Sequence, residues 1–229
     1  TSSLVGSEMC IRDSHIAGII ALVKHMKEIG ETHRLKQVWF NFPKKEETDE
    51  YSVGEGNELT SLLLEIDGLS WNNNTSELLG STIEFGDIKL HVLAPDHDVA
   101  YENKPKEPDE LGVRSDDWYI DLRTLIDNVD DDDIDEGGTN SQSIIILAEC
   151  EGKKLLLPGD STPKKLCDAL QSYNKTNGTP LELDFMKLPH HGSTRNVTKN
   201  ILNEVTCSNF IISTKKNNKY YFPIIIKTY

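Results

Sequence analysis

The chain has 229 residues, enough for one large domain or most of one. Its 38 Asp and Glu outnumber its 24 Lys and Arg, which gives a formal net charge of −14. This charge argues against a protein that coats nucleic acid with a basic surface, although bound metal ions can still attract phosphate groups. No apolar run in the sequence approaches the roughly 20 residues that a membrane-spanning helix needs. Cys150, Cys167 and Cys207 are scattered without CxxC spacing, which favours a reducing, cytoplasmic compartment.

The first fourteen residues, 1–14, are predicted not to belong to the native protein. The run Met9-Cys10-Ile11-Arg12-Asp13-Ser14 resembles the translation of a transposon-end adapter used in sequencing libraries, and residues 2–8 continue that pattern. An adapter-derived segment carries no information about the native fold. An ordinary flexible N-terminus is the alternative. We therefore take His15 as the first native residue and expect the native protein to begin upstream of it.

Periodicity and turn signals predict the elements of the N-terminal half. Residues 15–29 carry apolar side chains at helical spacing, and Gly30 follows as a stop signal. Alternating apolar residues on both sides of Gly86-Asp87 predict a tight hairpin. The same criteria predict helices over residues 15–29, from 52 or 57 to 66, and over 118–126, a strand over 35–40, and hairpin strands over 82–85 and 88–93.

The C-terminal half begins with an acidic stretch, residues 127–136, which predicts a solvated loop, with a calcium site as the alternative. A run of Ile at 144–146 predicts a strand buried on both faces. Residues 222–229 form either a last strand or an uncertain tail. The remaining predictions are hairpin strands over 143–150 and 153–157, helices over 162–170 and 197–205, and strands over 183–188 and 210–213.

This order of elements predicts the fold class. Hairpin pairs of strands alternate with single helices, which does not suit a doubly wound, all-parallel sheet. The pattern favours an α/β fold with mixed sheets layered between helices, the four-layer αββα sandwich.

Metal-ligand residues follow two of the predicted strands directly. Leu155–Leu157 leads into Pro158-Gly159-Asp160, and residues 184–188 lead into Pro189-His190-His191-Gly192-Ser193. Strand ends are where a layered α/β fold presents side chains to a cleft. Zinc binds imidazole nitrogen and carboxylate oxygen, and catalytic zinc sites keep one position for water. The two runs therefore predict a metal site, against the alternatives of a turn that tolerates Asp160 and of structural histidines.

The order of motifs from residue 15 onward resembles the metallo-β-lactamase fold family, in its competence-protein-like branch. His15-Ile16-Ala17-Gly18-Ile19 resembles the end of the His-x-His-x-Asp-His motif of that family, and Val38-Trp39-Phe40-Asn41 is similar to the next strand of the branch. The other matching runs are Thr139-Asn140-x-x-Ser143-Ile144-Ile145, Gly159-Asp160, Lys187-Leu188-x-His190-His191-Gly192-Ser193 and Ile211-Ile212-Ser213-Thr214. The resemblance covers about residues 15–221, and it implies an αββα domain over that range that is incomplete at its N-terminus.

The resemblance also implies a site with two adjacent divalent metal ions, usually zinc. His15 would be the last ligand of the first motif, and Asp160 would bridge the two ions. One of His190 and His191 would be a ligand, and the other would contact the leaving group or orient its neighbour. Two cations that share a water lower its pKa toward about 7, which supplies hydroxide at neutral pH. Ser193 is a weaker candidate for binding the substrate, and it serves equally well as a turn cap.

The sequence departs from the family in two places. The His-x-His-x-Asp half of the first motif is absent, and Ser14 stands where Asp is expected, so three metal ligands are missing. Phe222-Pro223 replaces the His-Pro pair that the branch tends to show after its last strand. We therefore expect the parent protein to be an enzyme and the chain as printed to be inactive.

Two functions from different classes follow. The first is a fragment of a dinuclear metallo-hydrolase that acts on a phosphodiester, either nucleic acid or a nucleotide. The second is a non-catalytic sensor or interaction domain of the same fold, which the missing ligands fit directly. A third interpretation is the soluble module of a larger membrane protein for DNA uptake. The native sequence immediately upstream of His15 discriminates between the first two, because it either supplies the missing ligands or lacks them.

We expect purified residues 1–229 to bind at most one divalent metal ion weakly, because most ligands of the first metal are missing. Calorimetric titration with zinc measures both the stoichiometry and the affinity. Tight binding of two zinc ions per chain would contradict this expectation.

Overall fold

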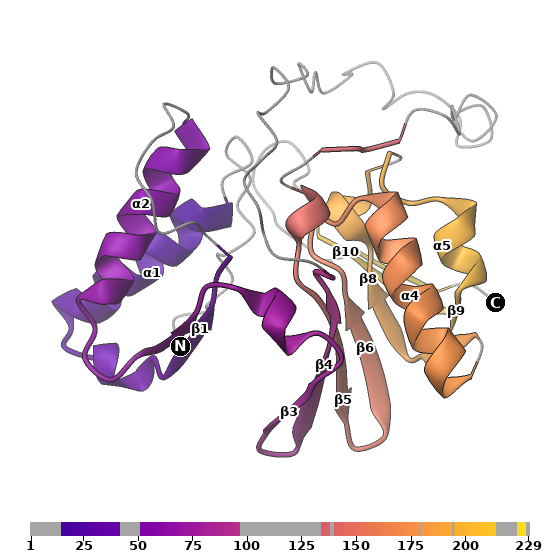
Figure 1. Cartoon of the computed structure of the whole chain (residues 1–229), viewed down its shortest axis with the longest axis horizontal. Coiled ribbons are helices and arrows are strands. Elements are labelled where there is room, and N and C mark those ends of the chain that lie inside the picture. Colours follow the sequence, from indigo (N-terminus) through magenta and orange to yellow (C-terminus); the bar gives the residue numbers. More distant parts are fainter. Residues whose placement is uncertain are drawn as a thin grey trace. The chain divides into compact units, whose positions relative to one another are not determined.

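The computed structural model describes residues 15–41, 51–96, 134–137, 140–178, 180–193, 195–213 and 224–227 (Figure 1). The chain forms two compact units, residues 1–77 with 215–222 and residues 78–214 with 223–229. The helix predicted over 118–126 and most of the acidic stretch lie outside the described residues. Within the described part, no helix combines the length and apolar character needed to cross a membrane.

The first unit is built on two helices, α1 (His15–Glu28) and α2 (Tyr51–Leu64), as the apolar spacing predicted. Their apolar faces meet, because the buried cluster takes Ile20 and Val23 from α1 and Leu59 and Leu63 from α2. Gly30 ends the first helix with a φ of 72°.

A short parallel sheet completes the first unit. β1 (Gln37–Trp39) lies within the predicted strand 35–40 and pairs with β2 (Ser70–Asn72), which the sequence did not predict. The Trp71 indole N–H donates a hydrogen bond to the Phe40 carbonyl at 3.1 Å, and the two rings stack. Two short 3-10 helices occupy Thr32–Arg34 and Thr75–Leu78.

The second unit contains a mixed seven-stranded sheet. The two predicted hairpins form its antiparallel half. Both residues of the second turn, Glu151 and Gly152, have positive φ, and so does Gly86 in the first. Strands β6, β8 and β10 run parallel, and β11 is antiparallel to β10. In spatial order the strands are β11 (Ile224–Lys227), β10 (Asn209–Ile212), β8 (Phe185–Lys187), β6 (Lys153–Leu157), β5 (Ile145–Cys150), β4 (Ile88–Ala94) and β3 (Thr82–Phe85).

One face of this sheet is covered by α4 (Pro163–Asn177) and α5 (Lys199–Asn203), which lie side by side in Figure 1. Leu147, Leu156 and Met186 are paired across three neighbouring strands, and all three are fully buried. Leu166 and Leu170 of α4 belong to the same fully buried cluster. The main core of the second unit therefore lies between the sheet and α4.

The opposite face of the sheet is also apolar but less buried. Leu90, Ala148, Leu155 and Phe185 are paired in one row across four strands, and none of them is fully buried. Phe185 is 38% exposed. The prediction that the strand at 143–150 is buried on both faces is therefore correct only for the face toward α4, because residues paired across strands share a face.

Three predicted elements differ from the structure. The helix expected over 162–170 continues to Asn177, and Pro163 occupies its first turn as expected. The strand expected over 183–188 is broken at Asp184, because the carboxylate there accepts hydrogen bonds from Lys153 Nζ at 2.8 Å and the Lys154 N–H at 2.9 Å. The helix expected over 197–205 is shorter, since α5 spans only Lys199–Asn203, and Val205 is the first residue of a strand. The extra strands β7 (Leu181–Leu183) and β9 (Val205–Cys207) pair with each other in a separate parallel sheet.

We expect Leu156→Ala to lower the free energy of unfolding by about 2–5 kcal/mol, because this side chain is fully buried and its loss leaves a cavity. Leu155→Ala is the matched control, since it removes the same atoms from the same strand on the half-buried face. Urea unfolding of both variants measures the difference. Equal losses would contradict the assignment of the core to the α4 face.

Candidate functional site

The two loops that the sequence singled out meet at one edge of the sheet. β6 and β8 are neighbours and parallel, with Leu155 paired to Phe185 and Leu156 to Met186, so their carboxyl ends lie on the same side. Gly159 and Asp160 follow β6, and the 3-10 turn Pro189–Gly192 follows β8. The His190 N–H donates a hydrogen bond to the Gly159 carbonyl at 3.2 Å. One backbone hydrogen bond therefore joins the Gly159-Asp160 loop to the His190-His191 loop.

Gly159 is required by the backbone of the first loop. Its φ is 62°, in the left-handed region that favours glycine. A Cβ at this position would also lie 3.2 Å from the Ser143 Cβ, closer than side-chain atoms normally approach. The glycine of the Gly-Asp pair is therefore required by this turn, which brings the chain close to Ser143.

The histidine pair has a strained backbone. His190 has φ 44° and ψ 53°, and His191 has φ 57° and ψ 18°, so two successive non-glycine residues are left-handed. Gly192 continues the same turn with a φ of 80°. Each non-glycine residue in this region costs on the order of 1–3 kcal/mol and persists only where its surroundings impose it. Backbone strain of this kind concentrates at functional sites.

His191 is oriented by the end of a neighbouring strand. Its Nδ1 lies 2.6 Å from the Ser213 carbonyl oxygen, immediately after β10. A carbonyl oxygen can only accept, so Nδ1 carries the proton of this hydrogen bond and the lone pair of a neutral ring is on Nε2. Metal-binding histidines commonly donate one ring N–H to a backbone carbonyl in this way.

His190 faces a carboxylate that the sequence did not single out. Its Nδ1 lies 3.5 Å from Asp135 Oδ2, and the two side chains are only 22% and 12% exposed. This nitrogen is buried and has no hydrogen-bond partner among the described residues. The His190 and His191 rings meet edge to face, with centroids 6.1 Å apart.

Asp135 is held by three N–H donors. The Gly137 N–H donates to Oδ1, and the Asn140 and Asn196 side-chain amides donate to Oδ2, each at 2.8 Å. Burial raises the pKa of this carboxyl, but these hydrogen bonds and the charge of His190 together lower it below its usual value. The prediction of a solvated acidic loop is therefore wrong for Asp135, because its side chain is an internal hydrogen-bond acceptor.

Asn196 connects this carboxylate to the Asp160 loop. Its side chain is 1% exposed, and its Nδ2 donates to the Ser161 carbonyl at 3.1 Å as well as to Asp135. The two residues that flank Asp160 are thus both hydrogen-bonded to the chain that follows β8. The Gly159 carbonyl accepts from the His190 N–H, and the Ser161 carbonyl accepts from Asn196 Nδ2. No periodicity in the sequence points to Asn196, since its partners are 35 and 61 residues away.

Ser193 acts within its own turn. Its Oγ accepts a hydrogen bond from the Arg195 N–H at 3.3 Å, and its carbonyl accepts one from the Asn196 N–H at 3.0 Å. This is the turn-capping role that the sequence left open. A contact between Ser193 and a substrate stays a prediction.

The predicted ligands do not form a complete metal site within the described part of the chain. His15 is the first residue of α1, and its side chain lies outside the described residues; Asp160, His190 and His191 all belong to the second unit. Among the described residues, no three His, Cys, Asp or Glu side chains gather into a group able to hold a metal ion. The two divalent ions therefore stay a prediction.

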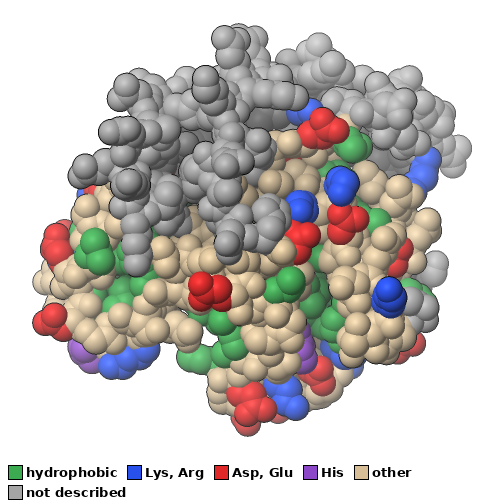
Figure 2. Space-filling model, viewed as in Figure 1, with side chains coloured by type: hydrophobic (Ala, Val, Ile, Leu, Met, Phe, Trp, Pro, Cys, Tyr) green, Lys and Arg blue, Asp and Glu red, His purple; other side chains and the backbone are tan. Residues whose placement is uncertain are grey.

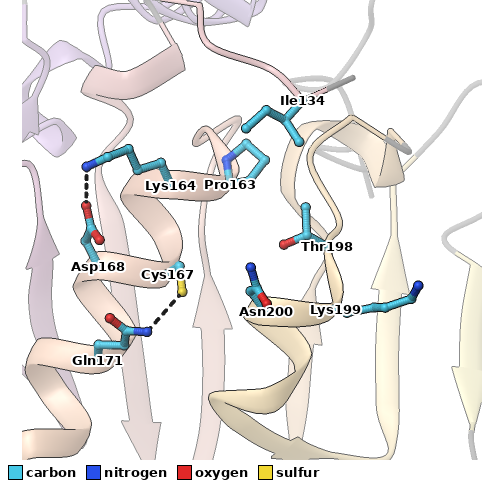
Figure 3. Close-up of a pocket in the computed structure, with 9 residues that line it drawn as sticks. All are labelled: Ile134, Pro163, Lys164, Cys167, Asp168, Gln171, Thr198, Lys199 and Asn200. Carbon is cyan, nitrogen blue, oxygen red and sulfur yellow. Dashed lines mark hydrogen bonds and ion pairs between the residues drawn. The ribbon is translucent and has the colours of Figure 1, made fainter. Parts of the chain in front are cut away.

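A separate groove of about 460 Å³ lies between α4 and the start of α5 (Figure 3). Cys167 lines it and lies 3.4 Å from Gln171 Nε2. The pKa of the Cys167 thiol is raised, mainly by burial and then by the nearby negative charges of Glu204 and Asp168. The thiol therefore favours its protonated form, which is less nucleophilic than the thiolate. The residues that line the groove include none of the predicted site residues.

The comparisons with known proteins give no family. No protein-family model matches the chain, and no curated protein matches it.

On the face shown in Figure 2, the Lys and Arg side chains of the described residues are interspersed with Asp and Glu. That described surface lacks the basic stripe typical of proteins that coat nucleic acid.

The lowered pKa of Asp135 predicts a pH dependence of stability. The unfolded pKa is about 3.9, so the contribution of this carboxylate is present above that pH and is lost as the pH falls through the lower folded value. We expect the stability difference between the unsubstituted chain and Asp135→Asn to be larger at about pH 6 than at about pH 3. Urea unfolding at both pH values measures it, and a difference independent of pH would contradict the prediction.

Proposed function

We propose that the chain is part of a metal-dependent hydrolase of the metallo-β-lactamase-like αββα type, which uses a metal-activated water on a phosphodiester. The observation that carries the proposal is the meeting of the Gly159-Asp160 and His190-His191 loops at the carboxyl ends of β6 and β8. The left-handed backbone at both histidines supports a functional role for this edge.

The sheet itself supports the αββα arrangement. The face opposite α4 carries the row of Leu90, Ala148, Leu155 and Phe185, which is apolar and incompletely buried. A sheet that is apolar on both faces is stable in water only when both faces are covered. A second layer over this face is what a four-layer sandwich provides.

The donor types at the edge suit zinc, although their number is incomplete. Zinc takes imidazole nitrogen and carboxylate oxygen, and His191 has the lone pair of its neutral ring on Nε2. A bound metal would supply a hydroxide at neutral pH and positive charge for a phosphate group. Because the described residues do not complete a ligand set, the role we assign to them is to hold and orient these donors.

The phosphodiester part of the proposal comes from the resemblance to the competence-protein-like branch. The net charge of −14 favours a small or metal-bridged anionic substrate over long nucleic acid. A β-lactam or thioester substrate would use the same metals and has less support from the motifs.

A non-catalytic sensor or interaction domain is the second candidate. One observation favours it: among the described residues, no three His, Cys, Asp or Glu side chains form a group able to hold a metal ion. If the chain is a non-catalytic domain, the strained turn at His190 and His191 must have a role other than metal binding.

Substitution of the proposed ligands tests the metal site. We expect the weak zinc binding of the chain to be lost in Asp160→Asn and in His191→Ala, because each removes a donor. His25→Gln is the matched control, since this histidine lies on α1 with a side chain 65% exposed. Calorimetry with zinc measures binding, and bis(4-nitrophenyl) phosphate and a chromogenic β-lactam report any residual turnover. Unchanged binding in both ligand variants would overturn the metal assignment, and no binding by the unsubstituted chain would favour the non-catalytic candidate.

A further inference from the structure

In both histidines, Nδ1 lies near an oxygen atom that can only accept a hydrogen bond. His191 Nδ1 lies 2.6 Å from a backbone carbonyl oxygen, that of Ser213. His190 Nδ1 lies 3.5 Å from a carboxylate oxygen, Oδ2 of Asp135. Carbonyl and carboxylate oxygens only accept hydrogen bonds, so both surroundings favour a ring that carries its proton on Nδ1. In that tautomer the lone pair of each ring is on Nε2.

The carboxylate is fixed before any ligand arrives. Oδ2 of Asp135 accepts from Asn140 and from Asn196, and Oδ1 accepts from the Gly137 N–H. Asn196 can only be oriented this way, because its Nδ2 faces two acceptors, Asp135 Oδ2 and the Ser161 carbonyl. A carboxylate held by three donors and 12% exposed does not turn away to solvent. Its remaining neighbour is the buried Nδ1 of His190, which has no hydrogen bond among the described residues.

We propose that Asp135 is a positioning residue that holds His190 in its Nδ1–H tautomer and leaves the lone pair on Nε2. The 3.5 Å separation is longer than a hydrogen bond, and a movement of about half an ångström brings it within the usual range of 2.7–3.2 Å. Such contacts are often long in ligand-free sites and tighten when the site is occupied. The use of the lone pair as a metal ligand or proton acceptor rests on the proposed function, whereas the tautomer itself does not.

The tautomer is measurable in the metal-free chain. Long-range ¹H–¹⁵N spectra at about pH 8.5, where an ordinary imidazole is neutral, distinguish a protonated from an unprotonated ring nitrogen. His190→Gln assigns the signals. We expect the unsubstituted chain to show His190 mainly as Nδ1–H, although an unconstrained histidine in water prefers Nε2–H. A His190 that is mainly Nε2–H in the unsubstituted chain would overturn the proposal without any Asp135 variant.

Two substitutions at Asp135 separate positioning from structure. Asp135→Ala removes the acceptor, and we expect the preference of His190 to invert to Nε2–H. Asp135→Asn restores an oxygen, which the Asn140 and Asn196 amides orient to the place of Oδ2, so we expect it to keep the Nδ1–H form. His191 serves as the internal reference, because its acceptor is a backbone carbonyl that these substitutions leave in place.

Asn140→Ala is the matched control. It deletes one hydrogen bond to the same carboxylate and weakens the same loop, but it leaves the oxygen that faces His190. We expect a lower urea midpoint with no change of tautomer. An Asp135→Ala variant that keeps the Nδ1–H form, or an Asn140→Ala variant that inverts as fully as Asp135→Ala, would reduce Asp135 to a structural role. The zinc titrations of the Asp160 and His191 variants decide the proposed function separately, since they leave Asp135 intact.

Discussion

The parallel pairing of β6 with β8 is the constraint on which the rest of the second unit depends. Parallel neighbours cannot be joined by a tight turn, so the chain between them must cross over one face of the sheet, and α4 provides that crossing. The crossing buries Leu166 and Leu170 against the sheet. It also places both strand ends at one edge, which is why Gly159 and His190 are within reach of one hydrogen bond although they are far apart in sequence.

The strained histidine turn lies beside the hydrogen-bonded Asp135 carboxylate at this edge and is tied to neighbouring segments. Two left-handed non-glycine residues cost on the order of 1–3 kcal/mol each. Hydrogen bonds that involve a charged partner contribute roughly 1.5–3 kcal/mol each, and Asp135 accepts three of them. The turn itself is tied to two other segments, by the hydrogen bond from the His190 N–H to the Gly159 carbonyl and by the one from His191 Nδ1 to the Ser213 carbonyl, so it is held from outside its own sequence. Loss of one donor therefore affects segments that are distant in the chain.

The parts of the fold that the sequence predicted are those specified by local patterns. The hairpins followed from alternation around Gly86-Asp87 and Glu151-Gly152, and the helices α1 and α2 from apolar spacing, so these elements are present close to the predicted bounds. Strands of three residues, such as β2, β7 and β9, are too short to show a period. The Asp184 break depends on a hydrogen bond 30 residues away, and the contact between Asp135 and Asn196 spans 61. Such long-range polar contacts have no local signal, which is why Asp135 was assigned to a solvated loop.

The strain at His190 and His191 bears on the choice between the two candidate functions. A sensor or interaction domain that had no use for the histidines would fold more stably with residues at these positions that tolerate a left-handed backbone, such as Gly or Asn. The chain instead carries two imidazoles there, one tied to the Ser213 carbonyl and one facing an ionised carboxylate that is only 12% exposed. Both arrangements favour the tautomer whose lone pair is on Nε2. A role that uses those lone pairs explains the strain and the orientation together, and this favours the metal-dependent candidate.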